Sequence, residues 1–429
     1  MEEAKLKKED NAEIIAEYPT SVTEGKKFTY NYWKNKPVSN FDETPVFSKN
    51  IETDLTQRKV YGNDEPIKLP SSMKWVEIDI NDTANIETIC KFLRAYYLVD
   101  DSGKYKLDYT KEFVKWAIES NGILLTIVSE KNNAICGVVS ASFRNMTVFE
   151  GKQTFGVVNF LCAHPVYRKK KIAYTLIDEI IRRIVKKGVH QGCFTTERCV
   201  PSPTSTLRFY HRPINYVKLN KFGFTDLELD KTPEQKNPEK IQKKIAVEPV
   251  IPSSYKPMEL KHIPDVYRVY NKYINKYNIY SNYTTKELEH FLLNSDTVSS
   301  YVIVDNDNEI VDFVSYYKLN YFMDDTVEKI TTAYLFLYSC NEINSTDFID
   351  NLLKVVSHNK LDMLNVTDTM IISDCLFTHE TTNGYDSDED TYSKQYQHGF
   401  LKGSGKLHFN FFNWKCPTVL PKQLSWFAF

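Results

Sequence analysis

The sequence lacks the features of a disulfide-stapled or zinc-binding protein, because its 8 cysteines are scattered and no two form a CxxC pair. It contains no run of about 18 apolar residues, the length that a membrane-spanning helix requires, so we expect no membrane span. Its first residues, MEEAKLKKEDNAEIIAEY, are polar and contain no apolar signal core. These absences favour a reduced setting, and we expect a cytoplasmic protein.

An excess of charge of one sign is also missing. Lys and Arg number 54 against 56 Asp and Glu, which gives a formal net charge of −2. Because this balance provides no bulk attraction to polyanions, we expect no nucleic-acid partner. No metal site is indicated, and a monomer is expected.

The chain is long and rich in aromatic residues. At 429 residues it exceeds the usual size of one hydrophobic core, which predicts two or three domains or one large fused unit. Aromatic residues make up 14% of the chain, a content that suits a protein lined with apolar grooves.

One stretch, residues 154–187, changes its period part-way. Phe155–Ala163 is an apolar run typical of a buried strand, and His164–Lys171 is a polar turn. From Ile172 onward, apolar residues recur at three- and four-residue spacing, which predicts an amphipathic helix. Four cations therefore stand beside the N–H groups of a helix N-terminus, an arrangement that suits a phosphate. A basic surface loop explains the same local chemistry equally well. The four cations are Arg168, Lys169, Lys170 and Lys171.

The order of expected elements occurs twice along the chain: helix, helix, hairpin, strand, helix, strand. This repetition favours two similar α/β units fused back to back. In the first unit we expect a leading strand at Trp75–Ile80, helices at Asn85–Tyr97 and Lys111–Ile118, and a hairpin of Leu124–Val128 with Ala134–Phe143. In the second we expect helices at Ile263–Tyr277, Thr285–Leu293 and Phe348–Asn359, a hairpin of Val298–Val304 with Ile310–Tyr317, and strands at Thr331–Tyr338 and Met363–Val366.

The same pattern predicts the division into domains. Residues 1–27 are expected to form a mobile polar tail, 28–231 the N-terminal half and 232–429 the C-terminal half. The acidic segment YDSDED is expected to lie in a solvated loop near residues 380–395.

Six motifs in order give the chain a resemblance to a known family: TYNYWKNKPV, EPIKLPSSMKW, NFLCAHPVYRKKKIA, RFYHR, DFVSYY and FNWKCP. With the spacing between them, they make the sequence similar to the eukaryotic N-myristoyltransferases, and the strand, basic turn and helix resemble the core of the GNAT acyltransferases. The resemblance implies two fused GNAT-like halves related by pseudo-twofold symmetry, with a mixed central sheet flanked by helices. The N-terminal half would bind myristoyl-CoA and the C-terminal half a peptide.

The resemblance also implies an activity, the transfer of a myristoyl group from myristoyl-CoA to the α-amine of an N-terminal glycine. Two backbone N–H groups of the family hold the thioester oxygen, and the matching positions are Phe160 and Leu161. Donors aimed at a developing oxyanion need no Ser or Cys nucleophile, so Cys162 is disfavoured in that role. Asn159 and Thr195 match residues around the reacting amine.

Further site residues follow from the same resemblance. The peptide lid is matched by Tyr97, Asp100 and Asp101, and the polar groups of the peptide groove by His211 and Ser315. The sequence departs from the family at Thr196-Glu197-Arg198, where small residues are usual, and in its three consecutive lysines. The positions matching the myristoyl-CoA site are Tyr30, Asn31, Tyr32, Trp33, Leu161, Cys162, Ala163, Arg168, Lys169, Lys170, Lys171, Ile172 and Ala173.

The family uses the main-chain carboxylate of its last residue as the base, which here is Phe429. Leu424, Trp426 and Phe427 before it are apolar, as a terminus that inserts into the core requires. The alternative base is the acidic loop at Asp100 and Asp101.

Two other functions remain open at this stage. One is a non-catalytic acyl-CoA or lipopeptide binding protein of the same fold. The other is a GNAT enzyme that acetylates amines, although it leaves the aromatic N-terminal segment and the duplicated half without a reason.

Overall fold

The computed structural model describes residues 15–98, 105–119, 121–168, 170–223, 237–323, 328–376 and 397–426. The predicted acidic loop near 380–395 lies outside these residues. So do four of the candidate site residues: Asp100, Asp101, Lys169 and Phe429.

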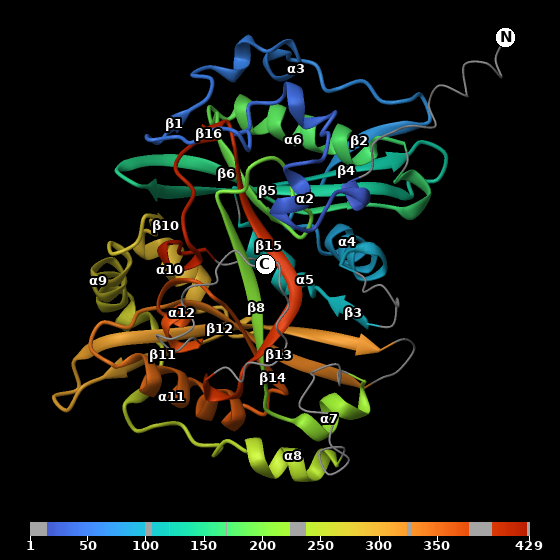
Figure 1. Cartoon of the computed structure of the whole chain (residues 1–429). Coiled ribbons are helices and arrows are strands. Elements are labelled where there is room, and N and C mark those ends of the chain that lie inside the picture. Colours follow the sequence, from blue (N-terminus) through green and yellow to red (C-terminus); the bar gives the residue numbers. More distant parts are fainter. Residues whose placement is uncertain are drawn as a thin grey trace.

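One sheet of 14 strands organises the described residues (Figure 1). Its first six strands in spatial order are β2 (Met73–Glu77), β4 (Ile123–Ser129), β5 (Ile135–Val148), β6 (Gly151–Ala163), β7 (Gly192–Thr196) and β15 (Leu401–Phe412). The next six are β8 (Ser205–Pro213), β14 (Met363–Thr367), β13 (Lys329–Tyr338), β12 (Ile310–Met323), β11 (Val298–Val304) and β9 (Tyr255–Pro257). Off this path, β10 (Ile279–Ser281) pairs with β5 and β3 (Tyr105–Asp108) with β12, while β1 (Lys49–Asn50) and β16 (Trp414–Lys415) form a separate pair.

The sheet has the same topology when it is followed inward from either edge. β6 and β7 are parallel in the first half, as β13 and β14 are in the second, and the other pairs on the path are antiparallel. Each half also lends a short strand to the long strand of the other, β3 to β12 and β10 to β5. The predicted fold class of two fused halves around a mixed sheet is therefore confirmed.

The two halves of the sheet do not coincide with the two halves of the chain. β8 precedes residue 231 but pairs with β14 of the second half, whereas the late strand β15 pairs with β7 of the first. β8 and β15 pair with each other and run between the upper and lower layers in Figure 1. A boundary near residue 231 thus divides the chain without dividing the sheet.

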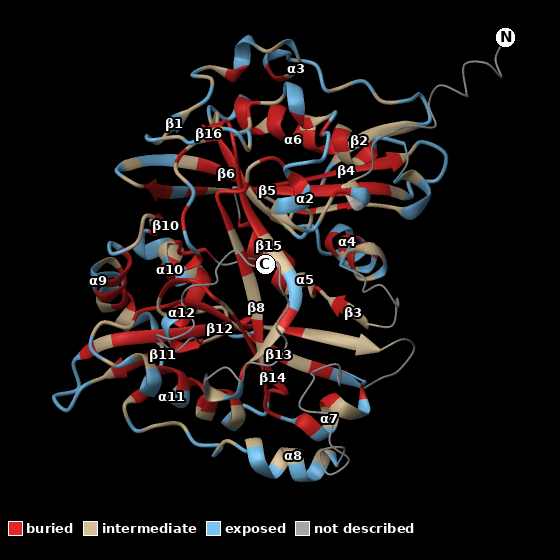
Figure 2. Ribbon diagram, in the orientation of Figure 1, coloured by how far each residue is buried: buried red, intermediate tan, exposed pale blue. Residues whose placement is uncertain are grey.

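Helices cover the faces of the sheet. The larger ones are α4 (Thr83–Tyr96), α5 (Lys111–Ile118), α6 (Ile172–Lys186), α8 (Pro238–Ile245), α9 (Ile263–Ile274), α10 (Thr285–Leu292) and α11 (Ser345–His358). The shorter ones are α2 (Val22–Gly25), α3 (Lys59–Gly62), α7 (Tyr216–Lys221) and α12 (Met370–Leu376). Their starts follow the sequence signals, for Asp82 accepts the first-turn N–H groups of α4 and Thr284 forms a capping box with Glu287 on α10. Figure 2 shows buried residues along the central strands and exposed ones along α8.

None of the helices within the described ranges is long and apolar enough to cross a bilayer.

Helix α6 lies unusually close to the sheet because two glycines face it. A Cβ atom at Gly137 would lie 2.8 Å from Leu176 Cδ1, and one at Gly156 would lie 2.8 Å from Ile184 Cδ1. The isoleucine and leucine stripe predicted for this helix is buried against β4, β5 and β6. This close contact fixes the start of α6 relative to the end of β6, which positions the site described below.

The predicted N-terminal tail is wrong for residues 15–27. Tyr18 is only 1% exposed, and its hydroxyl lies 3.0 Å from that of Tyr174 on α6. The carbonyl of Pro19 accepts the N–H of Cys199, and that of Thr20 lies 3.0 Å from Nε2 of His408. The polar composition of this segment gave no sign of the buried Tyr18 or of these backbone contacts.

Candidate functional site

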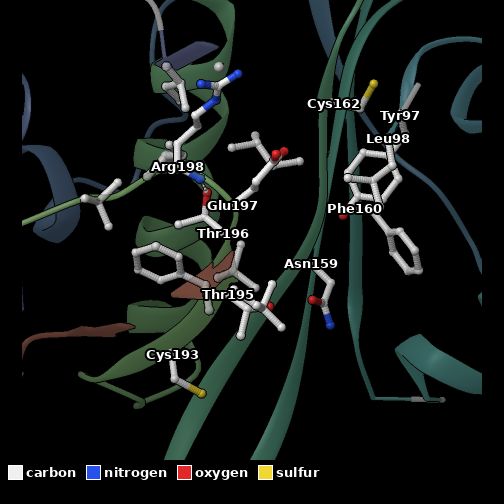
Figure 3. Close-up of a pocket in the computed structure, with 18 of the residues that line it drawn as sticks. Tyr97, Leu98, Asn159, Phe160, Cys162, Cys193, Thr195, Thr196, Glu197 and Arg198 are labelled. Carbon is white, nitrogen blue, oxygen red and sulfur yellow. Dashed lines mark hydrogen bonds between the residues drawn. The ribbon is translucent and has the colours of Figure 1, made fainter. Parts of the chain in front are cut away.

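The parallel strands β6 and β7 diverge after a short contact. They pair only at Gly156 with Gly192 and at Val157 with Cys193. Beyond that point β6 stays with β5, and a cavity of about 640 Å³ opens between the two strands. Figure 3 shows side chains of both strands facing this space.

A β-bulge stands in the β6 wall of the cavity. Val138 of β5 pairs with Cys162, but Ser140 pairs with Asn159, so β6 carries one extra residue in this interval. Phe160 adopts φ +53°, a left-handed conformation that is uncommon for a residue other than glycine. A bulge takes peptide groups out of the ladder, and this one does so where β6 borders the cavity.

Tyr97, at the end of α4, covers the bulge. Its ring lies 5.9 Å from that of Phe160. Burial raises the pKa of Tyr97 above its ordinary value, with a hydrogen bond to the Phe160 backbone acting in the opposite direction, so the phenol is neutral at physiological pH.

The deep end of the cavity is apolar. The inner face of α6 lines it over more than two turns, and Phe412 of β15 closes one side. An apolar lobe of this kind suits an aliphatic chain. In this lobe the lining residues of α6 are Ile177, Ile180, Ile181, Ile184 and Val185.

The N-terminus of α6 opens beside the same cavity. Its N-cap, Lys171, adopts φ +59°, and its side chain makes no capping hydrogen bond. Arg168 and Ala173 line the cavity on either side of this cap. The guanidinium of Arg168 donates to the carbonyl of Tyr96 (3.2 Å), which holds a positive charge at the mouth. A helix start with cations beside it is a site for an anionic group.

Comparisons with known proteins decide the family. The family model described as "Myristoyl-CoA:protein N-myristoyltransferase, N-terminal domain" matches residues 50–207, and the model of the C-terminal domain of the same family matches residues 222–425. The chain belongs to the N-myristoyltransferase family. It is an acyltransferase of that family, as the resemblance implied.

Relatives match over most of their length. A Caenorhabditis elegans protein named "Probable glycylpeptide N-tetradecanoyltransferase" is 28% identical, with 97% of this chain and 89% of that protein covered. The glycylpeptide N-tetradecanoyltransferase of Kluyveromyces lactis is 27% identical, with 90% and 86% covered.

Solved structures share the fold. Two structures of Saccharomyces cerevisiae N-myristoyltransferase with bound myristoyl-CoA superpose with TM-scores of 0.77 and 0.78 at 22% and 23% identity. The first covers 91% of this chain and 94% of its own, the second 92% and 90%.

The two predicted residues around the amine come together. Asn159 on β6 and Thr195 on β7 both line the cavity, from its opposite walls (Figure 3). Cys162 lines it as well, but burial raises the pKa of its thiol to about 12, so the thiol is protonated at neutral pH. This state argues against Cys162 as the nucleophile.

In the aromatic N-terminal segment, residues 30–33, Tyr32 packs against α6. Tyr32 stacks on Tyr174 with ring centroids 4.1 Å apart, and its hydroxyl donates to Asp178 (2.9 Å). Tyr30 donates to the carbonyl of Cys199, and Asn31 is exposed. Of the four residues that match the family here, Trp33 is the one that lines the cavity.

Three predicted residues of the turn, Lys170, Lys171 and Ile172, do not line the cavity. Ile172 is buried against the sheet at 3% exposure, and the ammonium group of Lys170 lies 5.4 Å from the ring centroid of Tyr167. Leu161 and Ala163 of β6, in contrast, line the cavity.

On the peptide side, one predicted residue lines the cavity and one does not. His211 on β8 lies in the wall, its Nδ1 2.6 Å from Oδ1 of Asn365, and burial lowers its pKa so that the imidazole is neutral. Ser315 is fully buried elsewhere, and its hydroxyl donates to the carbonyl of Leu337 (2.7 Å). Ser315 does not line this cavity, because this part of β12 lies inside the core, and its place in the peptide groove stays a prediction.

Sequence reasoning missed the aromatic wall of the second half. Tyr317 and Tyr334 stack with centroids 5.0 Å apart and an interplanar angle of 1°, and both line the cavity. Tyr321 of the same half and Tyr109 of the first half also line the cavity. Tyr317 stands in the DFVSYY motif, but nothing in the motif shows which of its residues faces the cavity.

Proposed function

We propose that this protein transfers a myristoyl group from myristoyl-CoA to the α-amine of an N-terminal glycine in protein substrates. The observation that carries the proposal is the bulge at Phe160, which borders one cavity together with an uncapped helix N-terminus and an apolar lobe. Acyl transfer from a coenzyme A thioester needs all three, for the oxyanion, the phosphates and the acyl chain.

The acyl donor would lie along α6. Its phosphates would meet the turn that carries Arg168, Lys169, Lys170 and Lys171, and its acyl chain would enter the lobe lined by the isoleucines of α6. The thioester oxygen would then accept from the backbone N–H groups of Phe160 and Leu161. Two structures of the yeast enzyme with the same fold contain bound myristoyl-CoA, which supports this molecule as the donor.

The acceptor peptide would approach from the side of the second half. Asn159 and Thr195 would hold the glycine amine between the two diverging strands. His211 and the aromatic wall would line the path of the peptide, and Tyr97, followed in the chain by Asp100 and Asp101, would form its lid. Because the amine must reach the narrow space between β6 and β7, a side chain on the first residue would clash.

The proposed base is the α-carboxylate of Phe429. An α-ammonium group has a pKa of ~8, so at neutral pH it must lose a proton before it attacks. Leu424, Ser425 and Trp426 are buried, at 0%, 2% and 6% exposure, and Trp426 packs on Phe409 with ring centroids 4.8 Å apart. This inward course of the chain up to Trp426 supports a carboxylate delivered to the interior three residues later.

The proposed step is a direct displacement. The amine nitrogen attacks the thioester carbon, and the oxyanion is held by the two N–H groups. The base has by then taken the first proton from the ammonium group. As the C–S bond breaks and the amide forms, the second proton of the nitrogen passes to the departing sulfur, and coenzyme A leaves as the free thiol. No residue of the chain is acylated on the way.

A transfer assay tests the proposal. The full chain is incubated with myristoyl-CoA and a glycine-first peptide, and with the same peptide carrying alanine first, and the products are weighed by mass spectrometry. We expect one myristoyl group on the glycine peptide and at least about a 100-fold lower rate for alanine, because the methyl group would prevent a near-attack geometry.

Two outcomes would contradict this function. Binding of myristoyl-CoA without turnover on any glycine-first peptide would identify a non-catalytic acyl-CoA binding protein. Equal rates for the glycine and alanine peptides would remove the closed amine pocket.

A further inference from the structure

The closed end of the cavity is built at the point where β6 and β7 meet. The pair Gly156–Gly192 is the first contact between the two strands, and the residue before it, Gln191, lines the cavity floor. The acyl lobe therefore ends at Gln191 and its neighbours.

A second hollow of about 610 Å³ lies on the other side of this floor. It is a surface hollow bordered by the β5–β6 hairpin and the end of α6, and it shares two residues with the inner cavity, Val189 and Gln191. These two residues are thus a partition between the apolar lobe and the outside.

Both polar atoms of the Gln191 side-chain amide form hydrogen bonds. Its Nε2 donates to the carbonyl of Thr154, and its Oε1 accepts from Nδ2 of Asn50 (2.9 Å). Its own carbonyl accepts the N–H of Gly156 (2.9 Å), and the residue is 8% exposed. A buried amide with its hydrogen bonds made is costly to displace, because each broken bond leaves a polar group unpaired.

The partners of this amide are fixed in turn. Asn50 also donates to the carbonyl of Asn413 (3.2 Å), and Asn413 donates to the carbonyls of Glu52 (2.9 Å) and His190 (2.7 Å). The network ties the N-terminal segment, the start of β7 and the end of β15 into one block. The floor of the lobe is therefore polar, and hydrogen bonds to several segments hold it in place.

We propose that Gln191 is the stop that sets the length of the acyl chain. The inference rests on the proposed function, since it takes the acyl chain to occupy this lobe. A chain that ends short of the amide fits without disturbing it, whereas a longer chain must break the bonds to Thr154 and Asn50 before it can advance. Behind the amide lies the outer hollow, so shortening the side chain opens a passage for extra methylenes.

The test compares acyl-CoA donors of different length. Lauroyl-, myristoyl- and palmitoyl-CoA are assayed for kcat/KM with one glycine-first peptide, and their binding is measured without peptide by calorimetry. In Gln191→Ala we expect the palmitoyl-to-myristoyl ratio of kcat/KM to rise at least about 10-fold, the discrimination that a single methylene commands in a tight apolar pocket.

A matched control is Gln153→Ala. Gln153 is exposed and borders the outer hollow without reaching the inner cavity, so the same truncation there should leave the ratio unchanged. If Gln191→Ala does not fold, Gln191→Asn carries the test. It keeps the amide but shortens the side chain by one methylene, and it should improve pentadecanoyl-CoA in particular.

Failure of this inference is distinguishable from failure of the proposed function. A folded Gln191→Ala that binds myristoyl-CoA and keeps the wild-type length preference overturns the stop. A wild-type protein that neither binds nor transfers myristoyl-CoA overturns the proposed function instead.

Discussion

The turns that open α6 and α11 occupy matching places in the two halves of the molecule and are built in opposite ways. In the first half the N–H of His164 donates to Cys136 O as β6 ends, and in the second the N–H of Ser339 donates to Phe313 O as β13 ends. By this register the residue before Cys136, Ile135, corresponds to the residue before Phe313, Asp312.

The turn before α11 already holds an anion. Asp312 is fully buried and accepts from the hydroxyl of Ser339 (2.8 Å) and from the backbone N–H groups of Asn341 (2.7 Å), Glu342 (2.9 Å) and Ile343 (3.2 Å). The carboxylate occupies three backbone N–H groups of the turn, which an external phosphate would otherwise have to bind.

Among the described residues, no carboxylate takes this place in the turn before α6. Ile135 supplies none, and the turn carries Arg168 and three lysines, whereas the turn before α11, SCNEIN, carries one acid and no Lys or Arg. The two halves thus use the same turn differently. In the second half a side chain of the protein occupies the N–H groups of the turn, and in the first half the turn is available to an external ligand. We infer that only the first half binds the acyl donor, which frees the second to receive the peptide.

The largest expected effect is the loss of the internal anion. In Asp312→Asn the amide must turn its NH₂ group toward N–H donors on one side, so at least one buried donor loses its partner. We expect the free energy of unfolding to fall by about 3 kcal/mol or more, as when one member of a buried charged network is removed. Denaturant unfolding measures it.

Asp305→Asn is the matched control. Asp305 also accepts two backbone N–H groups, those of Asp307 and Glu309, but it does so in the exposed turn between β11 and β12. Its replacement should cost less than about 1 kcal/mol, because water can satisfy the freed donors. If both variants lost the same free energy of unfolding, Asp312 would not stabilise its turn more than an exposed aspartate does.

The next largest effect is expected when the first half is given an acidic residue at the position that corresponds to Asp312. Ile135→Asp would place a carboxylate beside the α6 turn, where it would compete with the phosphates for the same donors and cations. We expect myristoyl-CoA affinity to fall at least about 10-fold, since a like charge within a few ångströms of an anion costs more than 1 kcal/mol near a protein surface. Calorimetry on the folded variant measures it.

Ile135→Asn separates charge from packing. The two replacements lose the same apolar contacts, but the amide has no charge to repel the phosphates. If both variants bind myristoyl-CoA equally weakly, the loss of affinity comes from packing. The idea that a carboxylate at position 135 competes with the phosphates, as Asp312 would, is then wrong.

Local periodicity predicted the elements that can be defined without distant partners. The expected helix at Lys111–Ile118 and the start of α6 at Ile172 match the structure, because apolar spacing marks both. β15 was not predicted, since Gly403 and Gly405 interrupt its alternation. That strand is defined by its pairing with β7 and β8, which the local sequence does not show.

The candidate site shows the same contrast between what the local sequence indicates and what depends on distant partners. Asn159 and Thr195, which the resemblance pointed to, face one cavity, but their meeting depends on the divergence of two strands. Ser315 does not line the cavity, and only the packed sheet decides which residues of a strand reach it. Gln191 carried no motif at all, and its position at the floor emerges from hydrogen bonds to residues more than thirty positions away.

The most direct test of the account is calorimetric binding of myristoyl-CoA to a protein whose α6 turn has been neutralised. We expect one site in the wild type and, in Lys169→Gln/Lys170→Gln/Lys171→Gln, an affinity about 10-fold lower at low salt and less affected at high salt, because screening removes surface attraction. The control Lys240→Gln/Lys243→Gln/Lys244→Gln makes the same charge change on exposed α8 and should bind like the wild type. Unchanged affinity in the α6 variant, or two equivalent sites in the wild type, would contradict the claim that the first half alone holds the acyl donor.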